Sequence, residues 1–218
     1  MRRLTILRPE PGASASLAIA RELAIHAVSH PLFAIERLAW EAPEAAGYDG
    51  LLLTSANAVR SAGDGLTQLR GLKVYAVGEA TAEAARNAGF DIAGTGSAGA
   101  EQLLGSIAGG QKLLHLCGED RAEIGDGPHE IAHIPVYRSA ELPPPEGLSD
   151  AEVVAVHSPR AARRFAELVL ERSRIAVAAI SAAAAEGLGE GWLQVVVAEC
   201  PDDRSLLVLA KELCDKPA

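Results

Sequence analysis

Several turn segments in this sequence place small or hydroxylated residues directly after an apolar run, where the next helix would begin. Backbone N–H groups at the start of a helix point outward and bind anions such as carboxylates. Neutral hydroxyl groups and a nearby cationic side chain add to that attraction. The predicted anion-binding residues are Arg8, Thr54, Ser55, Asn57, Gly78, Gly118, Ser158, Arg160 and Ser181.

The three serines at these turns have a second interpretation. Serine is among the commonest helix N-cap residues, because its side-chain oxygen accepts a hydrogen bond from a backbone N–H of the first turn. Pro159 follows Ser158 and suits the first position of a helix. Capping by Ser55, Ser158 and Ser181 therefore stays open beside anion binding.

Two histidine patterns suggest known kinds of site but fit them poorly. His129 and His133 are four residues apart, and in the strand predicted there this spacing separates them by about 13 Å. We therefore predict no metal site. His157 has no carboxylate partner that the sequence can assign, so we predict no catalytic triad.

The segment Gly94-Thr95-Gly96-Ser97-Ala98-Gly99 fits the G-x-G-x-x-G pattern of dinucleotide-binding proteins, and Glu119 follows twenty residues later. That pattern belongs to the first strand–helix unit of a sheet, yet the apolar run before it covers only 90–93. A cluster of turn glycines is the favoured interpretation. A nucleotide-binding oxidoreductase remains an alternative.

The elements that must position these turns are short strands, each apolar throughout, that alternate with helices. This pattern predicts parallel sheets covered on both faces, and hence an α/β fold. The predicted helices include 13–27, 79–88 and one beginning at 56. The predicted strands are 4–8, 49–55, 73–78, 112–118, 152–158, 174–181 and 194–199.

The chain is also an internal repeat. A shift of 103 residues aligns Ser55 with Ser158, Val74 with Val177 and Ala80 with Ala183, and it holds over three strand–helix units. We interpret it as a duplication of one small α/β unit. The second copy lacks a strand unless 4–8 supplies it, so one lobe is predicted to be discontinuous.

This reasoning gives three predicted regions. One lobe is 1–31 with 142–218, the other is 38–132, and 32–37 with 133–141 form hinge strands and a linker. The extended segments 30–36 and 133–139 would provide the two crossings. The helix expected after the 112–118 strand is reduced or missing, because 119–127 is short, acidic and rich in glycine.

Composition narrows the function. The 218 residues are 49% hydrophobic and carry a net charge of −9, which argues against nucleic-acid binding. No apolar run is long enough to span a bilayer. Cys117, Cys200 and Cys214 show no metal-like spacing and are typical of buried thiols in a reducing compartment. We therefore predict a cytoplasmic monomer that contacts neither membrane nor nucleic acid.

A family resemblance extends over nearly the whole chain. It rests on the order and spacing of several segments, and together these resemble uroporphyrinogen-III synthases. The segments are LTILRPEPGASASLAIARELA, DGLLLTSANAV, VYAVGEATAEAARNAGF, VYRS, VVAVHSPRAARRF and IAVAAISAAAAEGLGEGWLQVVVAECPDDRSLLVLAKEL. The resemblance implies two flavodoxin-like (Rossmann-like) lobes on a two-stranded hinge.

The resemblance also implies a reaction. Its family closes hydroxymethylbilane to uroporphyrinogen III, inverts the last ring and loses water, without metal or organic cofactor. Tyr137 is similar in position to a hinge tyrosine proposed as general acid, and Thr81 matches a threonine at the same turn in the family, so we expect it to contact substrate. Ala183 and Ala184 depart from a threonine-bearing turn of some members. Transient contact with hydroxymethylbilane synthase would also fit.

Alternatives remain for these assignments. Tyr137 is also explained as a strand aromatic that packs between lobes, because tyrosine favours strands. The whole chain is also explained as a two-lobed binding module that closes on a small ligand without catalysis.

Overall fold

The computed structural model describes residues 2–96, 99–121, 123–125 and 127–216. The chain forms two compact units: unit 1 is Met1–Ala34 with Ala140–Ala218, and unit 2 is Ile35–Ser139. Unit 1 is therefore discontinuous in sequence. The chain passes from one unit to the other within β3 (Phe33–Arg37) and again within β8 (Glu130–Glu141).

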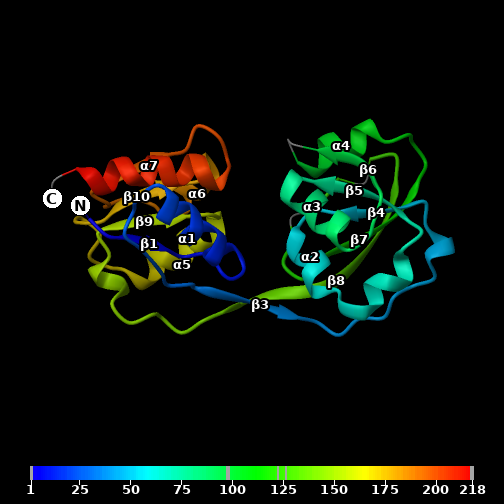
Figure 1. Ribbon diagram of the computed structural model, residues 1–218, viewed down its shortest axis with the longest axis horizontal. Coiled ribbons are helices and arrows are strands. Elements are labelled where there is room, and N and C mark those ends of the chain that lie inside the picture. Colours follow the sequence, from blue (N-terminus) through cyan, green and yellow to red (C-terminus); the bar gives the residue numbers. More distant parts are fainter. Residues whose placement is uncertain (1, 97–98, 122, 126, 217–218) are drawn as a thin grey trace. The chain divides into compact units, whose positions relative to one another are not determined.

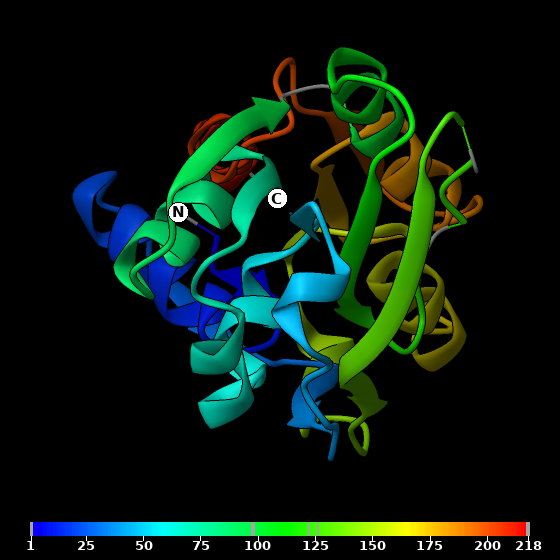
Figure 2. The same ribbon diagram turned by 90° about the vertical axis from the view of Figure 1, so that its right-hand side faces the viewer.

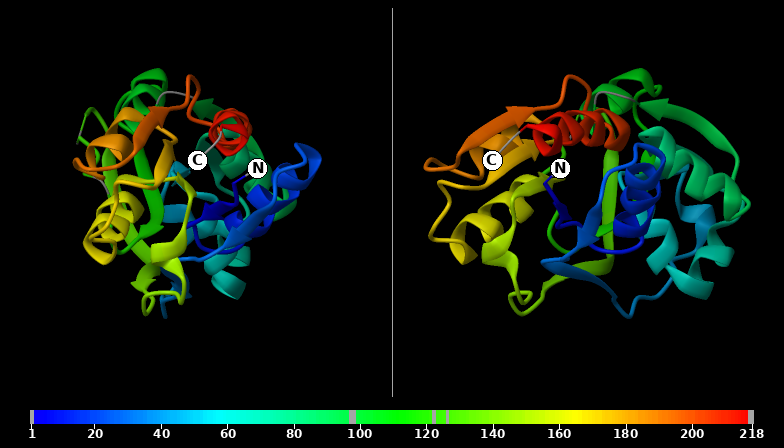
Figure 3. Two further views of the ribbon diagram at one scale, coloured as in Figure 1. Left: turned by 90° about the vertical axis from the view of Figure 1, so that its left-hand side faces the viewer. Right: turned by 60° about the vertical axis from the view of Figure 1, so that its left-hand side comes forward.

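Unit 1 contains a five-stranded parallel sheet in the order β2-β1-β9-β10-β11. Numbered along this unit, the order is 2-1-3-4-5, as in flavodoxin-like folds. Helices α1 and α7 pack on one face and α5 and α6 on the other (Figure 1); α7 is the red helix in Figure 3. The strands are β1 (Leu4–Ile6), β2 (Ala27–Ser29), β9 (Val153–Val156), β10 (Ala176–Ala179) and β11 (Gln194–Val197). The helices are α1 (Gly12–Glu22), α5 (Pro159–Leu168), α6 (Ala182–Glu186) and α7 (Asp203–Asp215).

Unit 2 contains a six-stranded sheet in the order β3-β8-β7-β4-β5-β6, and β4 to β8 are parallel. Helices α2 and α3 cover one face and α4 lies on the other. Strands β7 and β8 run side by side as green and yellow-green ribbons in Figure 2. The strands are β4 (Gly50–Leu53), β5 (Lys73–Val77), β6 (Ile92–Gly96) and β7 (Lys112–Gly118). The helices are α2 (Ala56–Ser61), α3 (Glu79–Asn87) and α4 (Ala100–Ser106).

The two units repeat each other, as the sequence predicted. Corresponding elements begin at residues 50 and 153, 56 and 159, 73 and 176, 79 and 182, and 100 and 203, and each pair differs by 103. In the sheet, β7 and β8 of unit 2 take the places of β1 and β2 in unit 1. Unit 2 is thus a circularly permuted copy of the same strand order.

The predicted α/β class and parallel sheets are confirmed, but the first helix ends earlier than expected. It was predicted to reach residue 27, yet α1 ends at Glu22 and β2 begins at Ala27. Ala24 adopts a left-handed φ of 56°, and the N–H of Ile25 donates to the carbonyl of Ala20. This helix-ending motif usually carries glycine, so alanine gave no signal of it.

Other boundaries also differ. The extended segment predicted at 30–36 begins after β2, which ends at Ser29, and only its later part is a strand, because β3 covers Phe33–Arg37. The strand predicted at 90–93 is β6, which begins at Ile92 and includes Gly94 and Gly96. Between β7 and β8 no helix forms in the described residues 119–121, 123–125 and 127–129, as predicted.

Among the described parts of the chain, no helix is both long enough and apolar enough to cross a bilayer.

Candidate functional site

A pocket of about 430 Å³ opens in unit 2 at the carboxyl ends of its strands. Thr54 and Ser55 follow β4, Gly118 ends β7, and Tyr137 lies on β8. Ligands of parallel α/β sheets bind at this edge. Four residues predicted from the sequence therefore line one cavity.

Tyr137 lies against the backbone of Gly118. The pairing of β7 with β8 shifts between Cys117 and Gly118, which sets Tyr137 opposite Gly118. A Cβ atom on Gly118 would lie 2.9 Å from Cζ of Tyr137 and 3.1 Å from its hydroxyl oxygen. Only glycine leaves room for the phenol in this position, so Gly118 fixes where Tyr137 stands in the pocket.

A polar chain that the sequence analysis missed continues from the pocket into the sheet. The Thr54 hydroxyl lies 3.0 Å from Nε2 of His115, and Nδ1 of His115 lies 3.0 Å from Nδ1 of His133. His115 is fully buried. Burial, together with the charges of His133 and Arg121, lowers the pKa of His115 to about 3, so its ring is neutral at pH 7.

The serines at the predicted turns all cap helices. The Ser55 hydroxyl accepts a hydrogen bond from the N–H of Asn57, at 3.1 Å, at the start of α2. Ser158 accepts from Ala161 in α5 and Ser181 from Ala184 in α6. Capping is confirmed for the three serines, and their contact with a ligand stays a prediction.

The remaining turn residues of unit 2 lie differently. Gly78 precedes α3 with a φ of 83°, a conformation that favours glycine. Thr81 is almost fully buried in α3 and does not line the pocket. The Asn57 side chain accepts a hydrogen bond from Arg60. Ligand contacts for Asn57, Gly78 and Thr81 stay predictions.

In unit 1 the corresponding turns meet at a network centred on Asp203. Its carboxylate accepts hydrogen bonds from the Ser16 hydroxyl at 2.7 and 2.9 Å and pairs with Arg8 at 3.1 Å. His157 Nε2 lies 2.8 Å from the same carboxylate. The sequence could not assign this carboxylate partner to His157, because the partner begins α7, 46 residues later.

Burial, hydrogen bonds and nearby charges shift the pKa values of His157 and Asp203 in this network. Burial lowers the pKa of His157 below its ordinary value, against the opposing effect of the Asp203 hydrogen bond. Burial raises the pKa of Asp203, but hydrogen bonds from His157 and Ser16 and the charge of Arg8 lower it overall. Arg8 is thus engaged within unit 1. Arg160 stacks over the Phe33 ring, with its guanidinium carbon 4.7 Å from the ring centroid.

Two further patterns noted in the sequence are the spacing of His129 and His133 and the G-x-G-x-x-G segment. His129 is not paired with His133, because its Nε2 lies 3.1 Å from the Leu104 carbonyl. Instead His115, Cys117 and His133 each bring one ligand-capable atom within 4.8 Å of the other two. The G-x-G-x-x-G segment includes Ser97 and Ala98, which lie outside the described residues.

Comparison with known proteins gives a consistent result. A family model described as "Uroporphyrinogen-III synthase HemD" matches residues 15–207. A search of curated proteins finds no match. A uroporphyrinogen-III synthetase structure from Helicobacter pylori is 18% identical, with 98% of this chain and 100% of that one covered and a TM-score of 0.69. A mutant uroporphyrinogen III synthase from Thermus thermophilus is 19% identical, with both chains covered over 100% and a TM-score of 0.63. At these identities, the structures show a shared fold.

Proposed function

This chain belongs to the uroporphyrinogen-III synthase family, whose members are cyclising hydro-lyases of tetrapyrrole biosynthesis, and we propose that Tyr137 donates the proton that this reaction needs. The observation that supports this role is the position of the phenol on Gly118, in a pocket at the carboxyl edge of the unit 2 sheet. A tyrosine hydroxyl carries a proton that it can donate, as a general acid must.

The reaction requires both a proton and an orientation. Hydroxymethylbilane loses its terminal hydroxyl group, which leaves as water once the phenol has protonated it, and an azafulvene-like cation remains. Attack through the substituted carbon of the last ring, by way of a spiro intermediate, inverts that ring. The proton lost on rearomatisation balances the one that Tyr137 gave. Without an enzyme the chain closes to isomer I, so most of the task is positioning.

The pocket suits the reacting end of the substrate. Its volume lies near the lower end of the range for small-ligand sites, so a chain of four pyrroles with eight carboxylates cannot fit entirely within it. Thr54, Ser55 and Arg121 offer donors for one or two of these carboxylates. Glu101 and Glu123 also line the pocket and would stabilise the cation that forms as water leaves.

The other predicted binding residues belong to the same proposal. They would hold the remaining carboxylates of the substrate at the turns of each unit. These residues are Arg8, Asn57, Gly78, Thr81, Ser158, Arg160 and Ser181.

The test is a coupled assay. Hydroxymethylbilane is generated in situ, the protein is added, and the uroporphyrin isomers are separated by chromatography. The parent protein should yield isomer III, and Tyr137→Phe should lower the rate by about 10²- to 10⁴-fold, the usual contribution of a general acid. Tyr75→Phe is a matched control, because the Tyr75 hydroxyl contacts Gln111 and does not line the pocket.

Each outcome has a separate meaning. Full activity of Tyr137→Phe would refute the acid role and leave the family assignment intact. Isomer I alone from folded parent protein would contradict the activity itself and favour a two-lobed binding module.

The proposal extends to the protein's surroundings. Cys117, Cys200 and Cys214 are all unpaired, which fits a reducing compartment such as the cytoplasm. Because hydroxymethylbilane closes spontaneously, transient contact with hydroxymethylbilane synthase would limit its loss. The net charge of −9 disfavours nucleic acid as a partner. A monomer is expected in size-exclusion chromatography with light scattering.

A further inference from the structure

The sheets of the two units differ on one face. In unit 1, Leu4 and Ile6 of β1 are fully buried in an apolar cluster that includes Ala20 of α1 and Leu206 of α7. In unit 2, β7 takes the place of β1, but no helix follows it in the described residues between β7 and β8. The unit 2 sheet around β7 is therefore covered differently from the unit 1 sheet around β1.

The strand register identifies what replaces the apolar residues. Ile6 pairs with Ala155 of β9, and His115 pairs with Leu52 of β4, 103 residues earlier in the repeat than Ala155. His115 therefore stands at the position of Ile6. On β2, Ser29 pairs with Ile6, and on β8, His133 pairs with His115.

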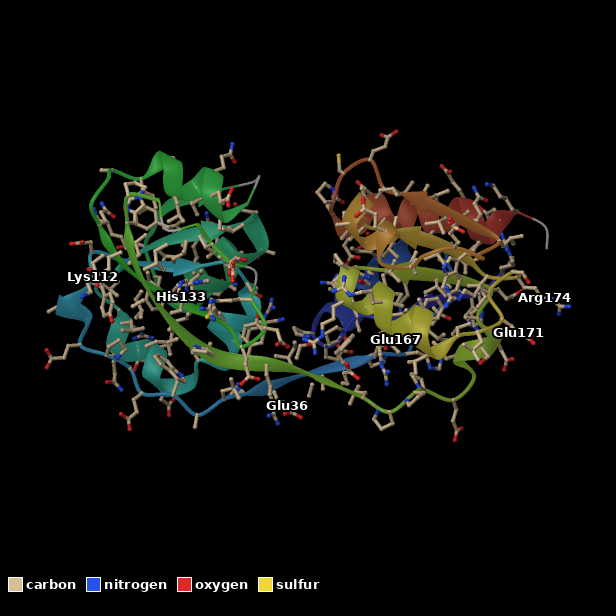
Figure 4. All side chains as sticks on the ribbon, turned by 180° about the vertical axis from the view of Figure 1, so that it is seen from behind. Glu36, Lys112, His133, Glu167, Glu171 and Arg174 are labelled. Atoms are coloured by element: carbon tan, nitrogen blue, oxygen red, sulfur yellow. The ribbon has the colours of Figure 1, made fainter. Side chains whose placement is uncertain are left out.

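Cys117 completes a group of three on the same face. Side chains alternate along a strand, so residues 113, 115 and 117 of β7 share one face of the sheet. Leu114 and Leu116 belong to the core on the opposite face. His115 and Cys117 are almost fully buried, and His133 is half-buried within the body of unit 2 (Figure 4).

The distances suit a shared cation. One nitrogen from each histidine and Sγ of Cys117 all lie within 4.8 Å of one another. The two Nδ1 atoms are 3.0 Å apart. Zinc bonds of about 2.0–2.1 Å to nitrogen and 2.3 Å to sulfur would set tetrahedral ligand atoms roughly 3.3–3.6 Å apart. Shifts of a few tenths of an ångström in the nitrogens bring them to that separation.

A supporting group for one ligand is already in place. A histidine that binds zinc usually donates its other ring N–H to an oxygen, which fixes its tautomer and orientation. Nε2 of His115 lies 3.0 Å from the Thr54 hydroxyl oxygen. With its proton on Nε2, His115 directs the lone pair of Nδ1 toward His133.

We propose that His115, Cys117 and His133 form a zinc site in unit 2. Two imidazoles and one thiolate are ligands that zinc prefers. Both histidines bind as neutral rings and Cys117 gives its thiol proton to solvent, so one proton leaves for each ion bound. Bound zinc would tie β7 to β8 just before Gly118 and Tyr137. The spacing in the sequence suggested only His129 as a partner for His133, but Nε2 of His129 lies 3.1 Å from the Leu104 carbonyl oxygen instead.

The experiment uses the full chain stripped of metal and titrated with zinc chloride in a calorimeter and with cobalt(II) in a spectrophotometer. The expected result is one equivalent of zinc, and a cobalt adduct with tetrahedral visible bands and a thiolate-to-cobalt charge-transfer band. Zinc should also raise the midpoint of thermal unfolding. None of these measurements depends on turnover, so the result is independent of the proposed reaction.

Variants decide where the ion binds. Cys117→Ser should abolish the charge-transfer band. Thr54→Val should keep that band and weaken zinc binding by about 10- to 100-fold, as loss of a supporting hydrogen bond does. Cys200→Ser removes an exposed thiol in unit 1 and should change neither result.

Three results would overturn the proposal. They are no thiolate band in the parent protein, full zinc affinity in folded Cys117→Ser, and loss of the band in Cys200→Ser. If circular dichroism shows that Cys117→Ser does not fold, the same titrations are made on His133→Asn. The His133 side chain is only half-buried, so this variant should disturb folding less. Unchanged zinc affinity in that variant would equally overturn the site.

Discussion

Replacing Gly118 with alanine should lower catalysis in a protein that still folds. The added Cβ would lie 2.9 Å from the Tyr137 ring, whereas ordinary contact begins at 3.4 Å, so the phenol must move by at least 3.4 − 2.9 = 0.5 Å. A misplacement of 1 Å at a catalytic group can cost about 10²-fold. We therefore expect kcat/KM for isomer III to fall roughly tenfold, half of that effect on a logarithmic scale.

The folding cost should be limited, because the ring can swing toward the pocket. Overpacking of about 1–3 kcal/mol is offset in part by the 0.4–1 kcal/mol that alanine gains over glycine through the unfolded chain. The free energy of unfolding in urea should therefore fall by at most about 3 − 0.4 = 2.6 kcal/mol. Gly105→Ala is the matched control: nothing lies within 4 Å of its added Cβ, and its activity should be unchanged.

A double variant tests whether the loss passes through the phenol. In a Tyr137→Phe background the hydroxyl is already missing, so adding Gly118→Ala should cost much less than it does alone. If Gly118→Ala lowers the rate equally in both backgrounds, the steric link between Gly118 and a catalytic Tyr137 is refuted. The coupled isomer assay supplies all four rates.

Three further predictions concern unit 1. Asp203→Ala should lower the free energy of unfolding in urea by about 3 kcal/mol, because Arg8 loses the carboxylate partner of a half-buried charge; a change under 1 kcal/mol would contradict this. Since the pKa of His157 is lowered in the folded state, the unfolded state binds more protons below about pH 6.5 and stability falls there, by up to about 1.4 kcal/mol per pH unit. His157→Asn should flatten this slope just below pH 6.5 in urea titrations, and an unchanged slope would refute it. Ser158→Ala should cost about 1 kcal/mol and Ser158→Gly only a few tenths, the order expected of an N-cap; equal losses in thermal melts would argue against capping.

The sequence predicted the fold well because strands buried on both faces are apolar throughout. The apolar runs of β4 and β9 align in the sequence with a shift of 103 residues, and β5 aligns with β10 at the same shift. The end of α1 could not be predicted, because Ala24 takes a backbone conformation that usually indicates glycine. The short strand β2 could not be predicted for the same reason, because the predicted helix extended to its first residue, Ala27.

The site was predictable only where it depends on local sequence. Ser55 and Gly118 stand at the ends of recognisable strands, so their place at the carboxyl edge of the sheet follows from topology. The contact between His115 and His133 depends on the register of β7 with β8 across 18 residues. Asp203 meets His157 only because α7 begins at that residue. Neither pairing can be predicted from the local sequence.

The discontinuous sheet of unit 1 imposes an order on biosynthesis. Leu4 of β1 pairs with Val153 of β9, so 153 − 4 = 149 residues separate these neighbours, and at about 5–20 residues per second the ribosome needs many seconds to make them. The 35–139 stretch of unit 2 emerges complete in the meantime and can fold first. Until β9 appears, β1 keeps an apolar, unpaired edge of the kind that pairs with other chains. A nascent chain that stalls in this interval is where aggregation, or capture by a chaperone, should concentrate.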